Sequence, residues 1–214
     1  MTRPKSVFDK TYEHYLSRIR DLSLPALQER LGIEVRGESA VIPLFGRPYR
    51  VSGEGVYDPL GKQPPLEVSV ILCRYLLMCP EEEPKKSEWV SFRDFRDTAP
   101  LRNYFKQEVE GAITKEFTRK TRDLAKASGL LGGVPLTEEY PHDITVRFQA
   151  LPRVPLLMLF NDEDDEFPAA CSVLFEKRAE KYLDGECLAI LGRLLFTSLI
   201  SAYETKPPTL HLQP

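Results

Sequence analysis

The most chemically suggestive stretch of this sequence is a run of five consecutive acidic residues, Asp162 to Glu166. It lies between two apolar segments, Val154 to Phe160 and Pro168 to Phe175, which predict the two strands of a hairpin. Clustered carboxylates can supply the oxygen ligands that calcium or magnesium prefers. The spacing differs from that of a calcium-binding loop, and adjacent strand residues point to opposite faces. We therefore predict a solvated turn, with a turn that contacts a ligand or partner and a metal site as the open alternatives.

Histidine and cysteine give little support for catalysis. None of the four cysteines has zinc or iron–sulfur spacing, and three sit among apolar residues, which predicts inert buried thiols. These cysteines are Cys73, Cys79, Cys171 and Cys187. His142 beside Asp143 is the one pair that suggests an oriented base, and a surface histidine at a strand entrance is the simpler interpretation. The sequence predicts no catalytic residue and no metal ligand.

Charged and amphipathic side chains inside otherwise apolar motifs suggest a binding site instead. Because buried charges need partners, arginines and carboxylates in such motifs predict an ion-pair network that is either structural or faces a pocket. We predict ligand binding near the hairpin and near the segment that carries the only tryptophan. The predicted ligand-binding residues are Trp89, Arg93, Arg147, Arg153, Asp165 and Glu166.

Composition excludes several classes of protein. The chain has 214 residues, of which 42% are hydrophobic and 29% charged, as in ordinary globular domains. A net charge of -3 argues against nucleic-acid binding, which usually needs a basic surface. No apolar run reaches the length of about 18 residues that predicts a membrane span. The first residues lack the apolar segment of a signal peptide, so we expect a cytoplasmic protein.

Hydrophobic periodicity predicts the elements that must position these residues. An N-terminal helical arm is followed by a small antiparallel meander, and Asp143 to Ala150 alternates as a half-buried strand. Two apolar core helices are predicted, at Leu66 to Met78 and at Asp184 to Tyr203. The segment from Pro80 to Lys86 is predicted to be an exposed loop. Two further helices are expected at Pro100 to Phe105 and Glu108 to Ala127.

The predicted fold class is α+β. An antiparallel sheet with the hairpin at its centre is packed by the two apolar helices, with the helical arm at the N-terminus. Residues 1–205 are expected to form one domain, and residues 206–214 a Pro-rich tail.

The order of several motifs resembles an uncharacterised prokaryotic family described only as a domain of unknown function. The resemblance spans roughly residues 6–203 of the chain. It is carried by Ala150 to Leu157, Asp165 to Ala169, Ser172 to Phe175, Ala179, Tyr182 and Leu183, and upstream by Ile42 to Val51, Tyr75 to Leu77 and Glu88 to Asp94. The resemblance implies an origin in anaerobic bacteria or archaea. Some members carry an added iron–sulfur segment, which hints at redox or corrinoid metabolism; this chain lacks that segment.

Three functional hypotheses follow. The first is a non-catalytic module of anaerobic metabolism that binds a small molecule, a cofactor of unknown identity or a partner protein. The second is a metal-assisted enzyme that uses the acidic turn with His142 or Arg147. The third is a structural subunit that docks to a partner through its C-terminal tail.

Overall fold

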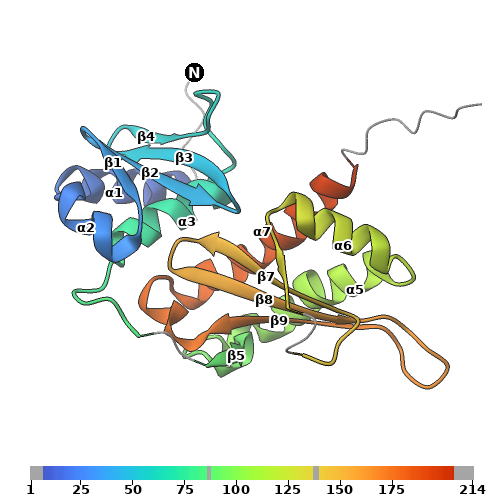
Figure 1. The fold of residues 1–214 in the computed structure, drawn as a ribbon. Coiled ribbons are helices and arrows are strands. Elements are labelled where there is room, and N and C mark those ends of the chain that lie inside the picture. The colour runs from blue at the N-terminus through green and yellow to red at the C-terminus, as the bar shows by residue number, and fades with distance from the viewer. Residues whose placement is uncertain (1–6, 86–87, 137–139, 205–214) are drawn as a thin grey trace, which may run out of the picture.

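The computed structural model of the chain describes residues 7–85, 88–136 and 140–204. Its elements separate into two lobes (Figure 1). The first lobe contains α1 (Val7–Arg20), α2 (Leu24–Leu31), β1 (Glu34–Arg36), β2 (Ser39–Leu44), β3 (Arg47–Ser52), β4 (Gly55–Tyr57) and α3 (Leu66–Leu77). The second begins with β5 (Trp89–Ser91), η1 (Phe92–Asp94), η2 (Ala99–Leu101), α4 (Arg102–Phe105), η3 (Lys106–Gly111) and α5 (Ala112–Phe117). It continues with α6 (Thr121–Leu130), β6 (Val134–Pro135), β7 (Ile144–Leu151), β8 (Val154–Asn161), β9 (Ala170–Glu176), η4 (Lys177–Lys181) and α7 (Gly185–Glu204).

The first lobe is a four-stranded antiparallel meander in the order β1-β2-β3-β4. Alternate residues of β2 are buried, and Phe45 and Gly46 turn the chain into β3 with positive φ angles of 47° and 75°. Such angles suit a tight hairpin whose twist matches that of its strands. The meander prediction is confirmed, although β4 was not expected. The predicted N-terminal arm does not project, because α1 packs against α3 and β3, and α2 against β1.

The second lobe is built on a five-stranded antiparallel sheet in the order β5-β9-β8-β7-β6. The predicted hairpin forms β8 and β9, and β8 lies at the centre of the sheet. Consecutive β8 residues from Val154 to Met158 are all buried, which confirms that this strand is covered on both faces. The α+β class is confirmed, with two sheets in place of the single sheet that we expected.

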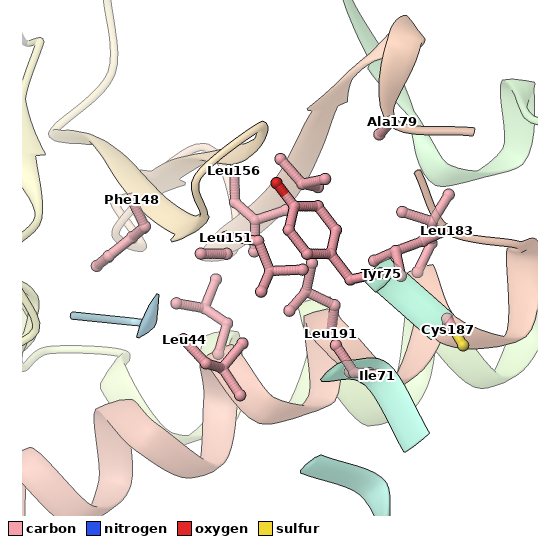
Figure 2. Packing of buried hydrophobic residues seen from close by; sticks show 14 of the residues in the cluster. Leu44, Ile71, Tyr75, Phe148, Leu151, Leu156, Ala179, Leu183, Cys187 and Leu191 are labelled. Carbon is pink, nitrogen blue, oxygen red and sulfur yellow. The ribbon is translucent and has the colours of Figure 1, made fainter. Parts of the chain in front are cut away.

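One hydrophobic core runs through both lobes. Figure 2 shows part of it, where Tyr75 of α3 lies among Leu151, Leu183 and Leu191. A backbone hydrogen bond from Phe45 N to Ala150 O, 2.9 Å long, also joins the two lobes. The β7–β8 hairpin and α3 therefore meet at the junction of the lobes.

The last helix, α7, is a core element. Asp184 precedes it and accepts a hydrogen bond from Cys187 N at 2.9 Å, as expected of an N-cap aspartate. Arg74 of α3 binds the other carboxylate oxygen at 2.5 Å. The pKa of Asp184 is lowered, because these partners outweigh the effect of its burial. Within the described residues, α7 alone has the length and apolar composition to cross a membrane, and several of its residues are buried in the core.

The long charged segment after Pro100 differs from its prediction. The helix that starts at Arg102 runs on through a π-helical turn, η3, into α5, and it ends at Phe117. Arg119, with a φ of 62°, then interrupts the helical conformation before α6 begins. Within η3, buried Glu110 accepts a hydrogen bond from Val173 N at 3.1 Å. This bond covers the edge of β9 beyond the end of the short strand β5.

Gly192 of α7 provides a test of this packing. A Cβ atom there would lie 2.5 Å from the ring of Phe105. We expect Gly192→Ala to lower the free energy of unfolding by about 1–3 kcal/mol through overpacking, although alanine favours a helix. Gly129→Ala in α6 is the matched control, because nothing lies within 4 Å of that Cβ position. Urea unfolding should show that the control raises the free energy of unfolding by roughly 0.5–1 kcal/mol. An equal increase in both variants would contradict the close contact between Gly192 and Phe105.

Candidate functional site

A cationic groove lies where the β7–β8 hairpin, the end of β9 and the segment after α3 come together. Its volume is about 540 Å³, within the usual range of small-molecule sites. The lining residues are Glu83, Pro84, Lys85, Arg147, Gln149, Pro152, Arg153, Pro155, Glu176 and Arg178. We call this feature the arginine groove. It contains two of the predicted ligand-binding residues, Arg147 and Arg153.

Arg153 is fixed by the C-terminus of α2. Its Nη2 and Nε atoms donate hydrogen bonds to Glu29 O at 2.7 Å and to Arg30 O at 3.2 Å. These carbonyls belong to the last turn of the helix, where a cation also interacts favourably with the helix dipole. Gly32 ends α2 with a φ of 65°, and a Cβ atom there would lie 3.2 Å from Pro152. The helix end and the hairpin turn therefore fit closely against each other.

Arg178 is the most buried cation of the groove, with a side chain 9% exposed. Its Nε donates a hydrogen bond to Glu176, which is 10% exposed, and its Nη1 donates to Pro84 O at 3.0 Å. Glu83 lies between this arginine and Arg153. One of its carboxylate oxygens is 3.0 Å from Arg153 Nη1 and 3.8 Å from Arg178 Nη1. The structure thus contains an arginine–carboxylate network beside a groove, but Arg153 is the one residue of our predicted set that takes part in these described ion pairs.

Arg147 differs from the other two arginines. It is half-buried on β7, and within the described parts of the chain its guanidinium has no ion pair and no hydrogen bond. Lys85 across the groove is exposed and also lacks a counter-ion within those parts. The nitrogen atoms of the Arg147 guanidinium are not buried, so they can donate hydrogen bonds to a ligand in the groove. The groove therefore has free capacity for an anion at Arg147.

An apolar row lies beside Arg147 on the same face of the sheet. Directly opposed residues of antiparallel strands share a face, and Arg147 opposes Leu157, which in turn opposes Leu174. Trp89 opposes Glu176 on this face, so the tryptophan flanks the groove without lining it. Leu157 is fully buried and Leu174 lines the separate groove near Arg93, so this row does not line the arginine groove.

Tyr182 follows η4 and is buried. Its hydroxyl is buried and has no hydrogen-bond partner among the residues that the structure describes. Burial raises its pKa, the positive charge of Arg178 lowers it, and the negative charge of Glu83 raises it.

The structure does not bring the other predicted ligand-binding residues to this groove. Arg93 lies on η1 beside a separate groove of about 420 Å³ that Arg102 and Lys106 also line. Its side chain is 76% exposed and only 3.9 Å from its neighbour Asp94, and Arg102 is bonded to Arg93 O. Asp165 and Glu166 are exposed in the loop that extends beyond the sheet between β8 and β9 (Figure 1). Their ligand-binding role stays a prediction.

The acidic turn uses several of its carboxylates to build the loop. Asp162 accepts hydrogen bonds from Arg119 N at 2.8 Å and Glu163 N at 3.0 Å, and Glu163 pairs with the Arg119 side chain. Asp164 accepts from the backbone N–H groups of Phe167 and Glu166, which lowers its pKa. No group of three metal-ligating side chains converges within residues 7–85, 88–136 and 140–204. The turn is well explained by its own hydrogen bonds.

His142 and Asp143 do not form the oriented pair that we considered. The imidazole Nδ1 lies 3.1 Å from Asn161 Oδ1, while the Asp143 carboxylate accepts a hydrogen bond from Asp162 N at 2.8 Å. The cysteines fit their prediction, since three are buried and Cys79 is half-buried. Burial raises the pKa of Cys73 to about 12, which keeps the thiol protonated at neutral pH.

Sequence reasoning missed four charged residues of the groove. Glu83 and Lys85 lie in the segment that we predicted as an exposed loop, and Glu176 and Arg178 follow directly after a predicted strand. The run Glu176-Lys-Arg178 partly indicated the ion pair of the groove, because residues at alternate positions of an extended segment can share a face. Nothing in the sequence places residue 83 beside residue 153.

Fold and groove together define an α+β protein with two antiparallel sheets and a cationic groove at the turn of the β7–β8 hairpin. The chain belongs to the family described as Domain of unknown function (DUF3786), whose model matches residues 23–198. This match confirms the resemblance to a domain of unknown function. Comparison with curated proteins and with solved structures gave no match.

Proposed function

We propose that this chain is a non-catalytic cytoplasmic module that binds a small anionic molecule in the arginine groove. The observation that carries the proposal is Arg147, an arginine that lines the groove and has no counter-ion within the described residues. An incoming carboxylate or phosphate supplies the missing partner through charge-assisted hydrogen bonds, which guanidinium geometry favours. Arg153 and Arg178, already fixed by other contacts, add to the positive potential of the groove.

The character of the lining supports recognition more than reaction. Its polar groups are guanidinium, ammonium, amide and carboxylate groups, and both carboxylates are already ion-paired with arginines. Among the described residues that line it, none carries a hydroxyl, thiol or imidazole group. Pro152 and Pro155 supply apolar surface in the groove for the carbon skeleton of the ligand. A place in anaerobic metabolism, redox or corrinoid-linked, is part of the proposal and rests on the resemblance of the motifs alone.

The first test is thermal unfolding of the full chain at low ionic strength with carboxylates and phosphates. A ligand at 100 times its Kd should raise the melting temperature by about 5 °C or more. Arg147→Gln should weaken binding of that ligand roughly 10- to 100-fold, because a charge-assisted hydrogen bond is lost. The variant should fold normally, since Arg147 has no side-chain partner in the described chain.

Arg122→Gln is the control for net charge. Arg122 is exposed on α6 and lies outside the groove. The control should bind like wild type. Equal weakening in both variants, or wild-type protein that responds to no anion at any concentration tested, would overturn the proposed function.

A further inference from the structure

Glu83 occupies a position in the groove that resembles that of a bound carboxylate. Its side chain is 40% exposed and belongs to the irregular segment between α3 and β5. Its carboxylate lies between two guanidinium groups, 3.0 Å from Arg153 and 3.8 Å from Arg178. Two arginines facing one carboxylate form a common arrangement for binding carboxylate ligands.

Neither arginine depends on Glu83 for its position. Arg153 is bonded to two carbonyls of α2, and Arg178 is bonded to Glu176 and to Pro84 O. Departure of the Glu83 side chain would therefore leave both guanidinium groups in place. A preorganised cationic pair would then be open to a carboxylate from outside.

The charges of the groove indicate how many anionic groups a ligand should carry. The lining contains four cations, Arg147, Arg153, Arg178 and Lys85, and two carboxylates, Glu83 and Glu176. Two positive charges are in excess. They belong to Arg147 and Lys85, because Glu83 and Glu176 balance the charges of Arg153 and Arg178. Displacement of the Glu83 carboxylate would leave one further positive charge at the Arg153–Arg178 pair.

We propose that the ligand is a short dicarboxylate and that Glu83 holds the place of one of its two carboxylates. This inference rests on the proposed function. One carboxylate of the ligand binds Arg147, and the other displaces the Glu83 side chain from Arg153 and Arg178. Glu83 thus competes with the ligand and raises the ligand concentration that is needed for occupancy.

The test is calorimetric titration of the full chain with succinate, glutarate and adipate, with propionate and inorganic phosphate as comparison ligands. Glu83→Gln removes the competing charge and keeps the size of the side chain. We expect this variant to bind the preferred dicarboxylate about 10-fold more tightly than wild type. Glu83→Ala is a second variant that should show the same direction of change.

Glu81→Gln is the matched control, because Glu81 is an exposed acid of the same segment and does not line the groove. It should bind like wild type. If wild type binds a dicarboxylate and neither Glu83 variant binds it more tightly, the inference is wrong and the proposed function stands. If phosphate or propionate binds as well as every dicarboxylate, the ligand class is wrong. If no variant binds any anion, the proposed function fails as well.

Discussion

Replacing Arg178 with methionine is expected to lower the free energy of unfolding by about 3–5 kcal/mol. Arg178 and Glu176 are 9% and 10% exposed, so the substitution leaves a nearly buried carboxylate without its main partner. It also removes the donor to Pro84 O. Urea unfolding followed by circular dichroism measures the change.

The double variant Glu176→Met with Arg178→Met should recover a large part of this loss. Two apolar side chains then replace the ion pair, and no unpaired charge remains buried. Arg36→Met is the matched control, because Arg36 pairs with Glu34 two residues away but both side chains are mostly exposed, at 70% and 56%. Little change is expected there. A double variant as unstable as the single one would show that the pair does not act as we describe.

Tyr75→Phe is expected to destabilise the protein by about 2 kcal/mol, because buried polar atoms lose their hydrogen bonds. The Tyr75 hydroxyl donates to Leu31 O at 2.7 Å and accepts from Arg153 N at 3.0 Å. It thereby joins α3, the end of α2 and the hairpin turn that carries Arg153. The same variant should weaken anion binding, because the position of this turn is less well fixed.

Tyr182→Phe is the control for removing a hydroxyl from a buried tyrosine. The Tyr182 hydroxyl has no partner within the described residues, so its removal should leave stability unchanged or raise it by up to about 1 kcal/mol. Thermal and urea unfolding of the Tyr75→Phe and Tyr182→Phe variants measure the two changes in stability. Equal losses of stability would contradict the hydrogen-bond assignment of Tyr75. Weaker ligand binding by Tyr182→Phe would place this hydroxyl in the site.

The elements that periodicity defines strongly were predicted well. The alternation along β7 and the apolar run of β8 predicted the two central strands. The apolar segment that starts at Leu66 predicted α3. Burial determines such patterns directly, so they can be read from the sequence. The break at Arg119 was missed, since a positive φ at a residue other than glycine has no sequence signal. The strand β4 was missed because it has only three residues.

The sequence predicted two residues of the candidate site, Arg147 on a predicted strand and Arg153 directly before the next one. Arg147 alternates with apolar residues along β7, so its position on the face opposite Val146 and Phe148 follows from the pattern. Glu83 reaches the groove from a segment with no periodicity, and its partners are distant in sequence. Arg93 and the acidic turn have the residue types of a site, but tertiary structure places them elsewhere. Long-range assembly, which local patterns do not encode, decides which charges meet.

The central claim is that the arginine groove holds an anionic small molecule, and native mass spectrometry of anaerobically purified protein tests it most directly. Wild-type protein and Arg147→Gln should be compared as purified and after addition of glutarate, with an absorption spectrum of each sample. We predict an added small-molecule mass on wild type, lost on denaturation, and a strongly reduced adduct on the variant. An adduct of equal abundance on both proteins, or no adduct on either before and after addition, would contradict the account.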